Sequence, residues 1–181
     1  MASYFKSIGD VVEKLAGMDY IADRALATVL YLAHQIEKPI FLEGEPGVGK
    51  TEVGLVLAKL FDVPLIRLQC YEGLDASTAL YEWNYPKQLL HIKLEEGGEH
   101  DQKEIENIIY GEAFLIKRPL LEAILRSKDQ TPVLLIDEID RSDEEFEAFL
   151  LEVLSDFQIT IPEMGTLAAR KRPMGVVTSN R

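Results

Sequence analysis

A chain of 181 residues, 47% of them hydrophobic, is long enough for one compact α/β domain with a substantial core. Its formal charge of -12 makes the surface as a whole repel nucleic-acid backbones and anionic membranes, so any anionic ligand has to be captured locally. The single cysteine, Cys70, excludes an intrachain disulfide, and the sequence shows neither a secretory signal nor an apolar run long enough to span a bilayer, so we expect a cytoplasmic protein.

The first part of the chain predicts two helices, a strand, a further helix and a second strand. Apolar residues recur at helical spacing over 5–15 and again over 21–36, ahead of the first strand. Residues 39–43 form a short apolar run that predicts a buried strand. Residues 51–61 have helical periodicity, and residues 64–69 predict the second strand.

The segment 72–117 is the least regular part of the sequence. Tyr81, Trp83 and Tyr85 stand at every second position, which favours core packing over a partner-binding face. The polar run 95–104 predicts an exposed, mobile tip. Because a parallel crossover between two strands needs only one helix, we interpret the segment as an insertion.

Helices and strands alternate in the remainder. Residues 119–127 predict a helix with proline in its first turn, and residues 133–136 and 174–178 predict strands. Ser142-Asp-Glu-Glu145 predicts a capping box that starts a helix, and residues 157–161 alternate weakly ahead of a turn. This order predicts an α/β fold with a parallel, doubly wound sheet, whose ligands bind beyond the carboxyl ends of the strands.

The strongest motif is Gly44-Glu-Pro-Gly-Val-Gly-Lys-Thr51, which fits the phosphate-binding Walker A pattern G-x-x-x-x-G-K-[ST] between a predicted strand and a predicted helix. Glycines let backbone N–H groups wrap a phosphate, Lys50 reaches the β- and γ-phosphates, and Thr51 offers a hydroxyl to Mg²⁺. We therefore expect ATP and Mg²⁺ as ligands. The expected nucleotide contacts are Glu45, Pro46, Gly47, Val48, Gly49, Lys50, Thr51 and Glu52.

Two adjacent carboxylates, Asp137 and Glu138, end the apolar strand that begins at Val133. We expect Asp137 to hold Mg²⁺ together with Thr51, and Glu138 to orient and deprotonate the water that attacks the γ-phosphate. Asn180 ends the last predicted strand, where its amide would lie beside Glu138 and position the same water. The expected catalytic residues are Glu138, Asn180 and Lys50.

Several further segments accompany these motifs, namely Leu68-Gln-Cys-Tyr-Glu-Gly-Leu-Asp75, Tyr81-Glu-Trp-Asn-Tyr85, Leu134-Leu-Ile-Asp-Glu-Ile-Asp140, Ile161-Pro-Glu-Met-Gly165 and Thr178-Ser-Asn180. With the Walker A motif they give a sequence that resembles the MoxR family of AAA+ ATPases over nearly its whole length. Tyr81-Glu-Trp-Asn-Tyr85 and Arg118-Pro-Leu-Leu121 are similar to the CoxD-type branch, which is associated with maturation of molybdenum-containing carbon monoxide dehydrogenase.

The resemblance implies a P-loop NTPase core of the AAA+ type, with residues 1–181 as its nucleotide-binding α/β subdomain. It implies N-terminal helices in 1–38, a helix-2-type insertion at 71–117 and a hairpin insertion at 157–172. The fifth strand and the C-terminal helical lid of a full family member, with its arginine finger, are then missing from this sequence, so hydrolysis by this length of chain is expected to be weak. By the same resemblance, Tyr20 and Ile21 contact adenine.

For the whole protein, the resemblance implies a hexamer with ATP sites between subunits and a chaperone that remodels protein clients in metalloenzyme maturation. Partners with a von Willebrand factor A domain are implied in the same way.

Three other functions stay open. An AAA+ motor on DNA is disfavoured by the acidic charge and by the shortness of the basic cluster at residues 170–172, so we expect no nucleic-acid and no membrane partner. A P-loop kinase is disfavoured because a water-activating carboxylate, Glu138, favours hydrolysis. A non-hydrolysing, ATP-gated scaffold is compatible with every motif above.

Overall fold

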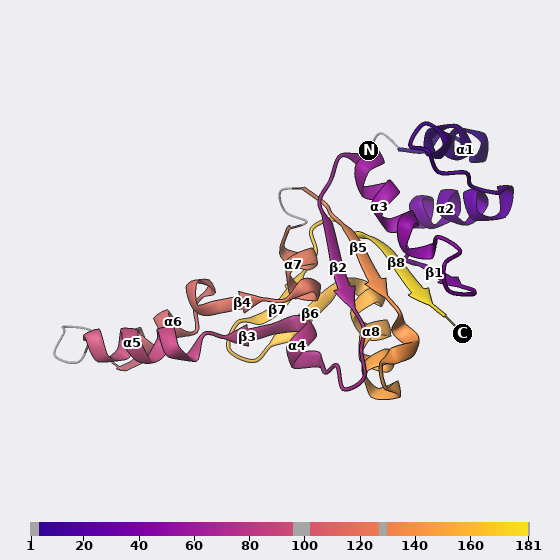
Figure 1. Cartoon of the computed structure of the whole chain (residues 1–181). Helices are drawn as coiled ribbons and strands as arrows, with labels where there is room; N and C mark the ends of the chain where they lie inside the picture. The colour runs from indigo at the N-terminus through magenta and orange to yellow at the C-terminus, as the bar shows by residue number, and fades with distance from the viewer. Residues whose placement is uncertain (1–3, 96–101, 127–129, 181) are drawn as a thin grey trace.

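The computed structural model describes residues 4–95, 102–126 and 130–180, and a four-stranded parallel sheet lies at its centre (Figure 1). The strand order is β1-β8-β5-β2. The bounds are Ile40–Glu43 for β1, Leu65–Gln69 for β2, Val133–Asp137 for β5 and Met174–Ser179 for β8. The predicted α/β fold with a parallel sheet is confirmed.

The register brings the carboxyl ends of the strands to one edge. Glu43 at the end of β1 is level with Ser179 of β8, and Gln69 at the end of β2 is level with Asp137 of β5. β1 and β2 are the two outer strands of the sheet, so the chain crosses its full width between them. It then returns through β5, next to β2, to β8, which lies between β5 and β1. Residues that are far apart in the sequence therefore meet where these strands end.

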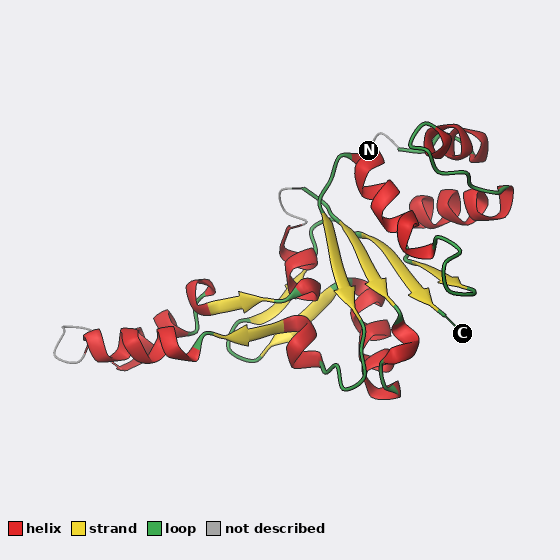
Figure 2. Ribbon diagram, viewed as in Figure 1, coloured by secondary structure: helices red, strands yellow, loops and turns green. Residues whose placement is uncertain are grey.

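Side chains that alternate along the strands feed two hydrophobic cores, one on each face of the sheet. In β5, Leu134 and Ile136 belong to one core and Val133 and Leu135 to the other, and the whole strand is buried. Helices cover both faces (Figure 2). The core of Leu135 contains residues of α1 (Ile8–Ala16), α2 (Arg24–Ile36) and α3 (Lys50–Phe61), and the core of Leu134 contains residues of α7 (Pro119–Arg126) and α8 (Glu144–Asp156).

The second helix differs from its prediction at its start and in its buried face. The Asp23 carboxylate accepts a hydrogen bond from the backbone N–H of Leu26 at 2.7 Å, so α2 begins at Arg24, and Ile21 lies ahead of it with 95% of its surface exposed. Apolar residues occur on both faces of α2, and sequence spacing alone does not say which face the core selects. The exposed members are Val29, Leu32 and Ile36, whereas Ala27, Leu30 and Ala33 are buried.

Between β2 and α7 the chain forms an arm that extends away from the sheet (Figures 1 and 2). Its neck is a two-stranded antiparallel sheet, closed by a 2.8 Å hydrogen bond from the Asn84 N–H to the Phe114 carbonyl. The elements in order are α4 (Ala76–Leu80), β3 (Tyr81–Trp83), α5 (Tyr85–Glu95), α6 (Gln102–Ile109), the 3-10 turn η1 (Glu112–Phe114) and β4 (Leu115–Lys117).

The structure bears on two predictions for the arm, and one of them requires correction. Core packing of the aromatic series holds for Trp83, which is 6% exposed, but Tyr85 begins α5 and is 60% exposed, because the alternation of a strand ends with β3. The polar run 95–104, predicted to be an exposed, mobile tip, is helical at both ends, since Glu95 ends α5 and Lys103 lies in α6. Residues 96–101 of this run are outside the described part of the chain.

The helix after β5 begins one residue later than the capping-box pattern predicts. Asp143, rather than Ser142, caps α8, and its carboxylate accepts the Phe146 N–H at 2.8 Å. Ser142 instead donates its hydroxyl to the Ile139 carbonyl at 2.7 Å and closes the 3-10 turn η2 (Ile139–Arg141). Serine and aspartate are both good N-caps, so the pattern fits either register, and the backbone after β5 decides between them.

An antiparallel hairpin of β6 (Gln158–Ile161) and β7 (Gly165–Ala168) precedes β8. At the start of β8, a Cβ on Gly175 would come within 2.7 Å of the Pro39 Cβ, so glycine allows the close approach of β8 to the entry of β1. Among the helices of the described residues, none is both long enough and apolar enough to cross a membrane.

Candidate functional site

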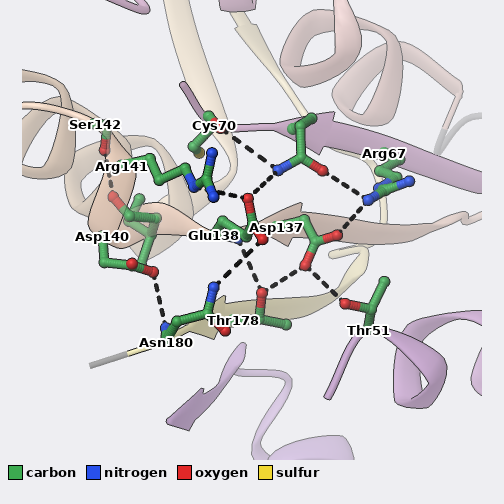
Figure 3. A network of polar contacts seen from close by, with 12 residues as sticks. Thr51, Arg67, Cys70, Asp137, Glu138, Asp140, Arg141, Ser142, Thr178 and Asn180 are labelled. Atoms are coloured by element: carbon green, nitrogen blue, oxygen red, sulfur yellow. Dashed lines mark hydrogen bonds and ion pairs between the residues drawn. The ribbon is translucent and has the colours of Figure 1, made fainter. Parts of the chain in front are cut away.

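Polar side chains from the ends of the central strands converge with the start of α3 at the carboxyl edge of the sheet (Figure 3). Asp137 comes from β5, Glu138 directly follows it, and Thr178 comes from the adjacent strand β8. Thr51 reaches the same place from the first turn of α3. The hydrogen bond between Thr51 and Asp137 joins residues 86 positions apart.

The phosphate-loop motif lies between β1 and α3. Gly47 and Gly49 have φ values of 85° and 90°, a left-handed conformation that glycine adopts readily. A Cβ built at either glycine would meet no heavy atom within 4 Å, so the backbone lines an open cradle. The Lys50 ammonium donates to the carbonyls of Gly44 at 2.8 Å and Glu45 at 2.7 Å, which folds the side chain back over the loop.

Asp137 is buried, and both of its carboxylate oxygens accept hydrogen bonds. Its Oδ1 accepts hydrogen bonds from the Thr51 hydroxyl at 2.9 Å and from the Thr178 hydroxyl at 2.6 Å, and its Oδ2 accepts one from Arg67 at 2.5 Å. Burial raises the pKa of the Asp137 carboxyl, but the hydrogen bonds from Thr178, Arg67 and Thr51 outweigh burial and hold this pKa below its ordinary value. Asp137 is therefore ionised at neutral pH.

Glu138 follows in a different environment. Its backbone is left-handed, with φ 57° and ψ 52°, which is uncommon for a residue other than glycine and typical of functional sites. Its N–H donates to the Thr178 hydroxyl at 3.0 Å, and its Oε1 accepts the Asn180 amide at 3.3 Å. Its Oε2 accepts from Gln69 at 3.0 Å and pairs with Arg141 at 3.0 Å.

Asn180 lies beside Glu138, as strand placement predicts, and its own backbone N–H donates to the Asp140 carboxylate at 2.8 Å. Sequence reasoning missed four neighbours of the carboxylates, which are Arg67, Gln69, Arg141 and Thr178. Arg67 and Gln69 are the exposed polar positions of β2, and this alternation is visible in the sequence. The pairing of β2 with β5, which brings them to Asp137, has no local signal.

The expected adenine contacts lie between α1 and α2. Burial, and after it the carboxylates of Asp23 and Glu52, raises the pKa of the Tyr20 hydroxyl, so Tyr20 is within electrostatic range of the first turn of α3. Ile21 is almost fully exposed and contributes no core packing.

Cys70, next to the site, is buried, and its pKa is raised to about 12 by burial and then by Asp137 and Asp140.

The donors at this edge suit Mg²⁺. Thr51 and Asp137 supply a hydroxyl and a carboxylate, and Mg²⁺ prefers such oxygen ligands in small number, with phosphate and water completing the octahedron. In the described part of the chain no group of three or more His, Cys, Asp or Glu side chains could hold a metal by itself.

A parallel sheet of this order, with a phosphate loop after β1 and an Asp-Glu pair at the end of β5, defines the AAA+ class of P-loop NTPase cores. The chain belongs to the AAA domain family, dynein-related subfamily, whose model matches residues 39–181. Members of the AAA+ class bind ATP, typically with Mg²⁺.

Two proteins of Cytophaga hutchinsonii are similar to this chain. A Lon protease is 30% identical over 151 residues, which cover 78% of this chain and 15% of that protein. The crystal structure of a protein named a "putative ATPase" has a TM-score of 0.54 and 20% sequence identity, and covers 98% of this chain and 43% of that chain. This chain thus spans less than half the length of either relative, and the structural likeness concerns the fold alone.

Proposed function

We propose that the chain binds Mg-ATP at the carboxyl edge of its sheet and hydrolyses it. The observation that carries this proposal is the direct hydrogen bond between Thr51 and Asp137, with Glu138 alongside. This bond supports the proposal, because a hydroxyl and a carboxylate at hydrogen-bonding distance can share one Mg²⁺ shell. An adjacent carboxylate outside that shell suits a general base.

In this proposal, each residue of the site has its own role in binding or hydrolysis. The backbone N–H groups of the loop 45–49, which Pro46 lacks, donate to the phosphates, and Lys50 exchanges its two carbonyl partners for phosphate oxygens. Bound Mg²⁺ would neutralise phosphate charge beside Thr51 and Asp137. Glu138 accepts the proton of the attacking water, and Asn180 holds the Glu138 carboxylate and that water in place.

The remaining nucleotide contacts are part of the same proposal. Tyr20 and Ile21 contact the adenine. Glu52, which follows Thr51 in the first turn of α3, also contacts the nucleotide. The exposure of Ile21 supports this assignment, because an exposed apolar side chain next to Tyr20, which lies within electrostatic range of Glu52, is available to pack against a base.

Replacement of Lys50 by alanine tests the site. Because the substitution leaves the β- and γ-phosphate charge unmatched, we expect affinity for a non-hydrolysable Mg-ATP analogue to fall by about tenfold or more in calorimetry. Lys59→Ala is a matched control, since Lys59 is an exposed lysine near the end of the same helix, and it should bind as the unchanged protein does. Equal affinities for the Lys50 and Lys59 variants would refute the assignment.

For the whole protein, we propose a MoxR-type remodelling chaperone of the CoxD-type branch that acts in metalloenzyme maturation in the cytoplasm. The sequence segments that resemble this family support the proposal, as does the arm, which extends away from the sheet and offers a surface to protein clients. We assign the arm to the insertion at 71–117 and the β6–β7 hairpin to that at 157–172. Hexamers and a partner with a von Willebrand factor A domain belong to the same proposal.

The net charge of -12 favours this role over a motor on DNA. Titration of labelled single-stranded and duplex DNA at moderate salt distinguishes the two, and we expect no saturable binding. Light scattering of the complete protein with Mg-ATP is expected to give the mass of a hexamer. Tight DNA binding, or a monomer at saturating nucleotide, would exclude the chaperone model.

A further inference from the structure

The carboxylate proposed for Mg²⁺ is paired with an arginine. One nitrogen, Arg67 Nη2, lies 2.5 Å from Asp137 Oδ2 and 2.6 Å from Gln69 Oε1 (Figure 3 shows the Asp137 contact). The Asp137 side chain is 3% exposed, whereas that of Arg67 is 50% exposed. A buried anion is thus neutralised by a cation that reaches it from the solvent side.

Arg67 is held in this position by its place in the sheet. It belongs to β2, whose register puts it level with Leu135, two residues before Asp137 in the neighbouring strand. Gln69 follows on the same face of β2, at the level of Asp137, and accepts the second hydrogen of the same nitrogen. The guanidinium is therefore directed at Oδ2, while Thr51 and Thr178 occupy Oδ1.

We propose that Arg67 is a positioning residue that competes with Mg²⁺ for Asp137, so that metal loading requires the guanidinium to leave Oδ2. The inference rests on the proposed Mg-ATP site. A carboxylate that accepts a hydrogen bond from arginine at one oxygen has fewer free lone pairs and less uncompensated charge for a divalent cation. Two cations bound to the same carboxylate also repel each other. The half-exposed side chain of Arg67 can swing away from the site into solvent.

The competition sets the Mg²⁺ concentration at which nucleotide binding switches to its metal-dependent form. Because the pair joins a buried carboxylate to a half-exposed arginine, its contribution lies between those of surface and buried ion pairs. Removal of the guanidinium is expected to lower the half-saturating Mg²⁺ concentration by about threefold to tenfold. Arg67 has no such effect on binding in the absence of Mg²⁺.

The test titrates Mg²⁺ into the protein with a fixed concentration of a fluorescent, non-hydrolysable ATP analogue, and repeats the nucleotide titration in EDTA. Arg67→Gln removes the charge, Arg67→Met does so while keeping an aliphatic stem, and Arg67→Lys keeps a cation. Arg141→Gln is the charge-matched control, since Arg141 pairs with Glu138 rather than with Asp137. Circular dichroism confirms that each variant is folded.

We expect the Mg²⁺ midpoint to fall in Arg67→Gln and Arg67→Met, to stay near that of the unchanged protein in Arg67→Lys, and to move less in Arg141→Gln. Affinity in EDTA should be the same for all. An unchanged midpoint in the Arg67 variants, or an equal shift in Arg141→Gln, would overturn the inference, as would a loss of affinity in EDTA that makes Arg67 a phosphate ligand. Failure of the unchanged protein to bind the analogue would instead refute the proposed site.

Discussion

Asp137 and Glu138 are neighbours in the chain, yet the structure gives them unlike surroundings. Asp137 is buried and accepts three hydrogen bonds, whereas the Glu138 side chain is 31% exposed and touches groups from three different segments. A buried, ionised carboxylate suits a fixed metal ligand. A partly exposed carboxylate on a left-handed backbone suits a base that must reach a water.

Glu138→Gln separates binding from chemistry. The amide keeps the shape of the side chain but cannot accept a proton, so we expect unchanged Mg-nucleotide affinity and a turnover about 10² to 10⁴ times lower. Calorimetry measures the affinity, and a phosphate-release assay measures the turnover. Glu145→Gln, at an exposed position in the first turn of α8, serves as the control and should keep its turnover. Persistent hydrolysis in Glu138→Gln would assign the base elsewhere.

Cys70 provides a pH-dependent prediction at the same scale. Its pKa of about 12 exceeds the ordinary value of 9.0, so the native fold favours the neutral thiol. We expect slow alkylation by iodoacetamide at pH 8, where only about 10⁻⁴ of the buried thiol is ionised, and fast alkylation in urea. Mass spectrometry follows both reactions.

The sign of the linkage follows from that raised pKa. The contribution of Cys70 to stability is complete below pH 9.0 and is lost as the pH rises toward 12. Cys70→Ala should therefore lose less stability over this interval than the unchanged protein. Equal alkylation rates in buffer and urea at pH 8 would contradict a buried, neutral thiol.

Among the elements, α8 shows how one residue sets where a helix begins. The Asp143 carboxylate accepts a hydrogen bond from an N–H in the first turn of α8, and its negative charge interacts favourably with the positive end of the helix dipole. We expect Asp143→Ala to lower the free energy of unfolding by about 1 kcal/mol in urea titrations. Ser142→Ala should cost less, because its hydroxyl bonds the turn η2 instead of the helix. The reverse order would restore the capping box that the sequence pattern predicts.

The whole molecule consists of a sheet with two covered faces and an arm on a narrow neck (Figure 2). Two side chains of α5 donate hydrogen bonds within the arm, Gln88 to the Ile109 carbonyl at 2.8 Å and Lys87 to the Ala113 carbonyl at 2.8 Å. Within its described residues, the arm contributes no side chain to the hydrogen bonds and ion pairs of Asp137 and Glu138. Folding of the sheet and binding of nucleotide should therefore be separable from the arm.

Replacement of residues 85–113 by a short glycine-serine turn tests this separation. Because β3 and β4 are already paired across the neck, the turn would close a simple hairpin. We expect a cooperative unfolding transition whose midpoint temperature is slightly lower, because the contact between Trp83 and Tyr110 is lost. The nucleotide affinity should stay within about twofold of the original. Loss of nucleotide binding in a folded variant would show that the arm supports the site.

Much of the fold and the position of the two adjacent carboxylates could be predicted because the signals are local. The apolar run that ends in Asp137 and Glu138 specifies a buried strand, and the glycines before Lys50 specify a loop that can wrap a phosphate. Each signal depends on residues within a few positions of one another. The prediction of where α8 begins was one residue early because it also depended on local signals alone, and serine and aspartate give equivalent local patterns.

Contacts between distant segments were decided only by the tertiary structure. Arg67 and Asp137 are 70 positions apart, and they meet because β2 pairs with β5 in one particular register. A shift of that register by one residue would turn Arg67 to the opposite face of the sheet. The sequence by itself therefore determined the strands, the phosphate loop and the two carboxylates, whereas the order and register of the strands decided which side chains surround those carboxylates.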